Sequence, residues 1–167
     1  KKRALDLREY LKKNTELDDK AKQEFYSDWS YSAIRLTCCI ESINTPDEIS
    51  KHLNLDPVSV KEKLQFLLNN GLVTENDGKL DLGTSTTFLD KKDPLINTHR
   101  KNWRLKAMDK FSQENDLFLV APMCLSKDLK KKLHTKLLKA FNEILEEVPH
   151  AEAEELICVN IDLFSVK

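Results

Sequence analysis

Two helix-start signals eleven residues apart constrain the fold of this chain more than any other feature of the sequence. In the first, Thr45 precedes Pro46, and Glu48 follows, which is a capping box with proline at the first helical position. In the second, Asp56 precedes Pro57. This spacing predicts a short helix over 46–53, a turn of two or three residues, and a second helix over 57–70.

The sequence after these signals predicts a hairpin. Gly71 ends the second helix at a position where a left-handed cap is favoured. Two short apolar runs, at 72–74 and 80–82, then flank a segment that contains Asp77 and Gly78. An Asp-Gly pair between such runs is typical of a β-hairpin.

Helical periodicity predicts two further elements before the start signals. Residues 3–13 form a short amphipathic pattern. Over 27–42, a helix capped by Ser27 or Asp28 would carry an apolar stripe, made of Trp29, Ala33, Leu36 and Ile40. Three helices followed by a hairpin, with a tight turn between the second and third, is the order of a winged helix-turn-helix.

The C-terminal half alternates helical and strand patterns. Pro94 starts a helix that runs to about residue 113, and Ser126 caps a long helix over 127–148. Strands are predicted over 116–124 and 156–166, where Ile157, Val159, Ile161 and Leu163 alternate with polar residues. Two strands cannot shield both faces alone, so we expect either pairing with a second chain, which we favour, or cover from the helix over 94–113 in the same chain.

The predicted fold class is therefore α+β, a winged helix-turn-helix followed by a helix-strand-helix-strand unit. The 167 residues suit one domain or two small ones tightly joined. We expect an N-terminal helix and lead-in over 1–24, a winged-helix domain over 25–84, and a C-terminal α/β regulatory or dimerisation unit over 85–167.

Charge is unevenly distributed in a chain whose formal net charge is only -1. Residues 91–110 hold seven Lys or Arg against two Asp, and residues 127–139 hold six Lys against one Asp. The next segment, 141–155, holds six Glu and no Lys or Arg. This pattern suits either an anionic partner or solvated helix faces.

Three segments together resemble one known family: residues 25–35 (FYSDWSYSAIR), 69–73 (NNGLV) and 159–164 (VNIDLF). It is an uncharacterised paralogous bacterial family, expanded in predatory and fibre-degrading bacteria, that carries a conserved domain of unknown function. The resemblance extends from about residue 22 over nearly the whole chain. It implies a transcriptional regulator with an additional helix-turn-helix upstream, and no established activity or ligand. Because residue 1 is Lys and not Met, we expect a longer protein that includes that upstream domain.

The first functional hypothesis is a bacterial, cytoplasmic transcription regulator that binds DNA. In a winged helix the third helix enters the major groove and the wing contacts phosphates. The candidate DNA-binding residues there are Ser59, Lys61, Lys63, Gln65, Asn69 and Lys79. However, residues 45–81 hold four Lys against seven acids. We therefore expect Arg100 and Arg104, which share a helical face, to carry DNA affinity from outside the winged helix.

The alternative is a protein-protein interaction and dimerisation module without direct DNA binding, and in either case we expect a homodimer. We expect no enzyme, since the chain has only three glycines and no phosphate-cradling loop or nucleophile motif. The scattered His and Cys residues predict no metal site, no cofactor and free thiols. No apolar run is long enough for a membrane span.

Overall fold

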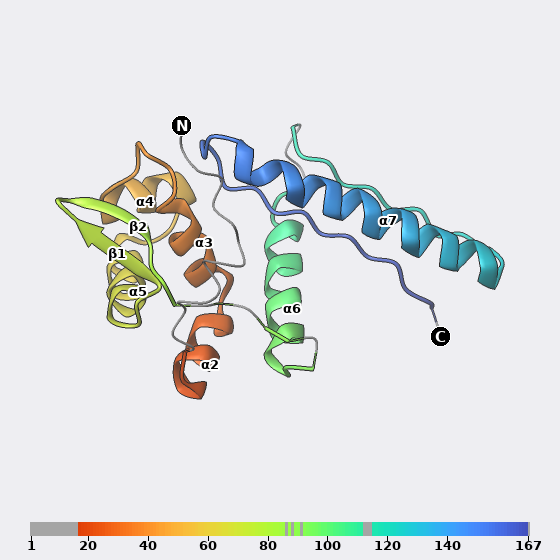
Figure 1. Ribbon diagram of the computed structural model, residues 1–167, viewed down its shortest axis with the longest axis horizontal. Helices are drawn as coiled ribbons and strands as arrows, with labels where there is room; N and C mark the ends of the chain where they lie inside the picture. Colours follow the sequence, from red (N-terminus) through yellow and green to blue (C-terminus); the bar gives the residue numbers. More distant parts are fainter. Residues whose placement is uncertain (1–16, 86, 88, 91, 112–114, 167) are drawn as a thin grey trace.

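The computed structural model describes residues 17–85, 87, 89–90, 92–111 and 115–166. Within them, the elements follow in the order α2 (Asp19–Ser27), α3 (Trp29–Thr37), α4 (Pro46–Leu53), α5 (Pro57–Asn69), β1 (Val73–Asn76), β2 (Lys79–Leu82), α6 (Leu95–Met108), α7 (Lys127–Glu147) and the 3₁₀ helix η1 (Val148–His150). Helices α2 to α5 and the hairpin gather at one end, α6 stands beside them, and α7 extends away (Figure 1). The fold is a mixture of helices and one small antiparallel sheet, consistent with α+β.

Both helix-start signals form as predicted. At α4, the Thr45 hydroxyl accepts a hydrogen bond from the Glu48 amide at 3.2 Å, and the Glu48 carboxylate accepts one from the Thr45 amide at 3.0 Å. At α5, the Asp56 carboxylate accepts a hydrogen bond from the Ser59 amide at 2.8 Å. These side chains satisfy amides that have no partner inside the helix, which fixes where each helix begins.

The turn between α4 and α5 is tight because Asn54 adopts a left-handed conformation, with φ of 51°. The Leu55 amide then donates to the Ser50 carbonyl at 3.0 Å, and the Ser50 hydroxyl donates to the Leu55 carbonyl at 2.7 Å. Asparagine tolerates this conformation better than most residues with a Cβ. The turn directs α5 back across α4 and α3, against both of which it packs.

Gly71 ends α5 in a Schellman motif. Its φ is +65°, the Leu72 amide donates to the Leu67 carbonyl at 2.9 Å, and the Gly71 amide donates to the Leu68 carbonyl at 3.1 Å. The chain then enters β1 and turns through Asp77 and Gly78, both at positive φ, into antiparallel β2. The predicted hairpin is confirmed.

The core lies entirely in the first half of the described chain. All sixteen buried hydrophobic residues fall between Leu17 and Leu80. Helix α5 contributes Val60, Leu64 and Leu67, as its periodicity predicts, while Leu68 is only half-buried. Because α5 contacts α3, α4 and β1, its apolar stripe is covered along its length.

The structure corrects the sequence analysis before residue 45. Helix α2 was not predicted, although Ala21 and Phe25 are buried from its inner face. The predicted helix over 27–42 begins after Asp28, its N-cap, and ends at Thr37. Two successive turns then bury Ile40 and Ile43. The predicted helix over 3–13 lies outside the described residues.

Helix α6 joins the second half of the chain to the core. The Asn102 amide donates to the carbonyls of Tyr26 and Ser27 at 3.0 and 3.1 Å. The Trp103 ring packs edge-on against Trp29. These contacts seat α6 on α2 and α3. The helix ends at Met108, five residues before the predicted end.

The last part of the chain departs most from the sequence analysis. Helix α7 forms with Ser126 as its N-cap, as predicted, but none of its residues is buried. The segments predicted as strands, 116–124 and 156–166, form no strand within the described residues and run as uncoiled chain (Figure 1). A strand needs a neighbour for its backbone hydrogen bonds, and the described chain supplies none there. The predicted helix-strand-helix-strand unit is therefore corrected to two helices with two unpaired segments.

Candidate nucleic-acid interface

The outward side of α5 presents the polar residues that the sequence singled out. Lys61, Gln65 and Asn69 are exposed, and Ser59 is half-buried in the first turn. The Gln65 amide donates to the Asn69 side-chain oxygen at 2.8 Å. These residues lie opposite the stripe that packs into the core, so the packing of α5 is what leaves them accessible.

Lys61 and Lys63 have different environments although they are two residues apart. The Lys61 ammonium lies 3.4 Å from Asp47, and both side chains are well exposed, so this ion pair is weak and open to exchange. Lys63 turns toward α3 instead. Its ammonium donates to the Ser30 hydroxyl at 2.6 Å, lies 3.5 Å from Asp28, and sits over the Tyr31 ring.

The Lys63 contacts are part of the N-cap of α3. The Asp28 carboxylate accepts a hydrogen bond from the Ser30 amide at 2.8 Å and another from the Ser30 hydroxyl. Burial raises the pKa of Asp28, but the hydrogen bonds from Ser30 and the Lys63 charge outweigh burial and hold the pKa below its ordinary value. Lys63 therefore stabilises the fold and does not extend the outward surface of α5.

The hairpin turn adds one of the predicted cations to this end of the molecule. Lys79 is exposed at the start of β2, opposite Asn76 in the register. Its neighbours at the turn include Glu75 and Asp77, which are also exposed. The turn is therefore not a strongly basic surface.

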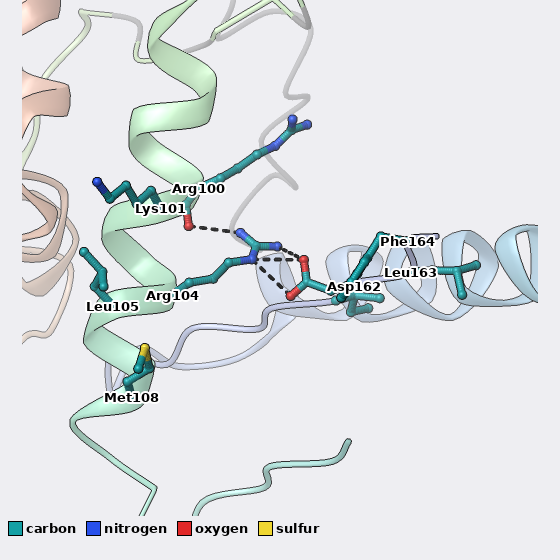
Figure 2. A pocket seen from close by; sticks show the side chains of 9 residues that line it. Arg100, Lys101, Arg104, Leu105, Met108, Asp162, Leu163 and Phe164 are labelled. Atoms are coloured by element: carbon teal, nitrogen blue, oxygen red, sulfur yellow. Dashed lines mark hydrogen bonds and ion pairs between the residues drawn. The ribbon is translucent and has the colours of Figure 1, made fainter. Parts of the chain in front are cut away.

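Arg100 and Arg104 lie elsewhere, on α6. They line an open cleft of about 590 Å³ between α6 and the C-terminal segment (Figure 2). The Nε–H of Arg104 is shared between the two oxygens of the Asp162 carboxylate, at 2.9 and 3.0 Å, and its Nη2 donates to the same group. Arg100 donates to the Asn97 side chain at 3.4 Å and is exposed.

The structure thus divides the predicted site residues between two surfaces. Helix α5 packs on one part of α3, and α6 packs on α2 and another part of α3. Figure 1 shows α3 between α5 and α6. We group the α5 residues with Lys79, on the hairpin that follows α5, as one surface, and Arg100 with Arg104, on α6, as the second. Lys63 belongs to neither because its ammonium is bonded to Ser30.

Two residues important to these surfaces were missed by sequence reasoning. Val58 is 63% exposed in the first turn of α5. It does not share the helical spacing of Val60 and Leu64, and this was the sequence signal that its side chain faces outward. Asp162 neutralises Arg104 across 58 residues of sequence, and no local pattern indicates such a pairing.

No group of three or more His, Cys, Asp or Glu side chains within the residues that the structure describes is arranged to hold a metal ion. None of the described helices has the length and apolar character needed to cross a bilayer.

Comparison with known proteins gives one match. No curated protein and no solved structure is significantly similar to the chain. Residues 9–166 match the family described as "Domain of unknown function (DUF4423)". This match covers nearly the whole chain, both surfaces and the segments between them. The chain therefore belongs to the DUF4423 family of domains of unknown function.

Proposed function

We propose that residues 29–82 act as a winged helix within a gene-regulatory protein, with the outward side of α5 as its DNA-contacting surface. The observation that carries this proposal is the placement of α5. The helix is buried on one side against α3, α4 and β1 and leaves polar side chains exposed on the other. A recognition helix in a helix-turn-helix protein is presented in this way.

The exposed side chains have the chemistry for reading base edges. Gln65 and Asn69 carry the amide groups that pair with adenine in the major groove, and Val58 offers an apolar contact for a thymine methyl group. Lys61 and Lys79 would contact phosphates or guanine. Among the predicted residues, Lys63 is removed from this role because its ammonium is already bonded to Ser30.

The affinity of this surface alone is expected to be low. Residues 45–81 carry three more acids than lysines, and phosphate neutralisation supplies most non-specific affinity. Arg100 and Arg104 on α6 would add phosphate contacts, with Arg104 first released from Asp162. The upstream helix-turn-helix expected in the longer protein would add a second set of contacts.

The test is a DNA titration of the 167-residue chain by fluorescence anisotropy, at several salt concentrations. The DNA comes from a selection on random sequences. We expect Lys61→Ala/Gln65→Ala to weaken binding roughly 10-fold or more and to lower the salt slope by about one. The matched control is Lys20→Ala/Gln23→Ala on α2, where both residues are exposed. Equal affinity for wild type and both variants would contradict the proposed surface.

A second double variant separates the two surfaces. Arg100→Ala/Arg104→Ala should weaken binding to all sequences alike, since phosphate contacts carry no sequence information. If this change has no effect while Lys61→Ala/Gln65→Ala does, α5 and the hairpin carry the affinity by themselves. The reverse result would assign it to α6.

A protein-binding role for the same α5 surface is the second candidate. It is favoured by the exposed Val58, by the acids around the hairpin turn, and by the diversion of Lys63 into the fold. If the chain binds no DNA even at low salt, a photo-crosslinking residue at Gln65 in the full-length protein tests this alternative. A specific crosslinked protein would support it.

A further inference from the structure

The strongest unexplained feature of the molecule is the exposed apolar surface at its C-terminal end. Of the twenty-one large hydrophobic side chains that are exposed in the described chain, sixteen lie between Leu117 and Val166. They come from α7, from the 3₁₀ helix η1 and from the two uncoiled segments. Exposed apolar side chains gathered in one region mark an interaction site when nothing in the same chain covers them.

The backbone of this region is also without partners. No backbone hydrogen bond joins residues 117–125 or 152–166 to any other described residue. Side chains hold the C-terminal segment in place instead. Asp162 is bound by Arg104, and the Lys130 ammonium donates to the Ser165 hydroxyl at 2.6 Å. The segment therefore lies against α7 with its amides and carbonyls still available.

Helix α7 has apolar residues on a face wider than its own chain can cover. Leu133, Leu137 and Phe141 are half-buried along one line. The apolar residues on either side of this line are exposed. Leu129 is 46% exposed on one side, and on the other Leu138 is 50% and Leu145 is 51% exposed. No other α-helix of the described chain packs closely on α7, which contacts only the short 3₁₀ helix η1 that follows it to a comparable extent.

The charges on α7 indicate what covers this face. The first part of the helix, in residues 127–139, holds six Lys and one Asp. Its last part, in residues 140–147, holds three Glu and no Lys or Arg, and three more Glu follow by residue 155. Such a helix is complementary to a second copy of itself that runs in the opposite direction. Each lysine-rich half then lies beside a glutamate-rich half, and a two-fold axis relates the two contacts.

We infer that two copies of this chain associate through α7 in an antiparallel arrangement. The 21 residues of α7 span about 30 Å, and with the flanking segments this length gives a contact of the same order as the ~800 Å² per partner found in stable dimers. The unpaired backbone at 117–125 and 152–166 lies at the border of this contact, where the second copy would meet it. The inference goes beyond the proposed function, because it requires no DNA.

The test uses charge reversal and measures mass in solution. One variant changes Lys131, Lys132 and Lys136 to Glu, and the other changes Glu143, Glu146 and Glu147 to Lys. Sedimentation velocity at micromolar concentration should give a dimer for wild type and a monomer for each variant, because like charges then face each other. A 1:1 mixture of the variants should recover a dimer, with an apparent Kd at least roughly 10-fold below that of either variant alone.

Two controls keep the test decisive. Reversal of three exposed lysines away from α7, Lys20, Lys51 and Lys92, makes the same change in net charge and should leave the dimer intact. Circular dichroism checks that α7 is still helical in each variant. A monomeric wild type, or a dimer that neither reversal weakens, would overturn the inference. Since no step uses DNA, failure here is distinguishable from failure of the DNA titration.

Discussion

Helices α5 and α7 carry the same kind of sequence pattern and end in opposite environments. Both have an apolar stripe at helical spacing and a side-chain cap at the first turn. In α5 the stripe residues Val60, Leu64 and Leu67 are at most 5% exposed, whereas α7 has no buried residue. An amphipathic pattern therefore predicts that a helix forms and which side is apolar. Burial depends on whether other elements reach that side.

This comparison extends to the regions around the two helices. Residues 17–85 contain the core, the hairpin and the caps that join them. Residues 115–166 are attached to that core through α6 and side-chain contacts such as Arg104 with Asp162. We expect the first region to set the stability of the isolated chain and the second to contribute mainly when it has a partner.

The largest expected effect comes from truncating the buried stripe of α5. Leu64→Ala should reduce the free energy of unfolding by about 2–5 kcal/mol, because Leu64 is 5% exposed and its removal leaves a cavity. The matched change in α7 is Leu138→Ala, at a position 50% exposed in the single chain, which should cost less than about 1 kcal/mol at a protein concentration low enough to keep the chain monomeric. Urea denaturation followed by tryptophan fluorescence measures both. Similar costs for the two changes would contradict the contrast between the helices.

Thiol reactivity gives a second comparison of the regions. Cys38 is buried in the first region, and burial raises the pKa of its thiol to about 12, while Cys124 is exposed in the second. At pH 8 and low protein concentration, we expect Cys124 to react with a thiol reagent at least ~100-fold faster than Cys38. Mass spectrometry of the labelled peptides provides the rates. Equal rates under native conditions would show that the first region opens as readily as the second.

The N-cap of α3 should contribute a smaller, pH-dependent share of the stability. Asp28→Ala removes the acceptor of the Ser30 bonds and the partner of Lys63, and should cost about 0.5–2 kcal/mol near neutral pH. Since the pKa of Asp28 is lower in the folded chain than its ordinary 3.8, the stabilisation is present above that value. It is lost as the pH falls through the folded pKa.

Denaturation curves at a series of pH values test this expectation. The difference between wild type and Asp28→Ala should narrow as the pH drops from about 6 to about 2.5. Asp28→Asn keeps a capping group without the charge, so it separates the hydrogen bonds from the Lys63 interaction. A difference that widens toward acidic pH would show that the sign of the pKa shift is wrong.

The smallest expected effect is that of the ion pair between the regions. Arg104 and Asp162 are both partly exposed, so Arg104→Ala should change the free energy of unfolding by no more than about 1 kcal/mol. Its main effect should be on local attachment, with faster proteolysis at residues 152–166. The control is Arg100→Ala, which leaves Asp162 bound. Unchanged proteolysis in Arg104→Ala would mean that the ion pair does not hold the segment.

Local signals in the sequence determined much of the first region. The capping box at Thr45, the cap at Asp56, Gly71 and the Asp77-Gly78 turn each specify a backbone conformation within a few residues, and the structure contains all of them. Such signals are readable from sequence because the interacting groups are three or four residues apart. Helix α2 was missed because its short apolar pattern lies among charged residues, although Asp18 caps its first turn by accepting from the Ala21 amide. Its packing on α3 and α6 is seen only in the tertiary structure.

Only the tertiary structure decided which surfaces these elements form. Lys61 and Lys63 look equivalent in sequence, but Ser30 and Asp28, more than thirty residues away, draw Lys63 into the fold. Arg104 is neutralised by Asp162, which lies 58 residues further along the sequence, so no local pattern indicates the pair. The strand patterns at 116–124 and 156–166 remain unpaired in the described chain, because alternation specifies a face but a ladder requires a neighbour. Sequence determined the elements here through short-range hydrogen bonds and periodicity, whereas burial, ion pairing and strand formation depended on contacts between distant parts of the chain.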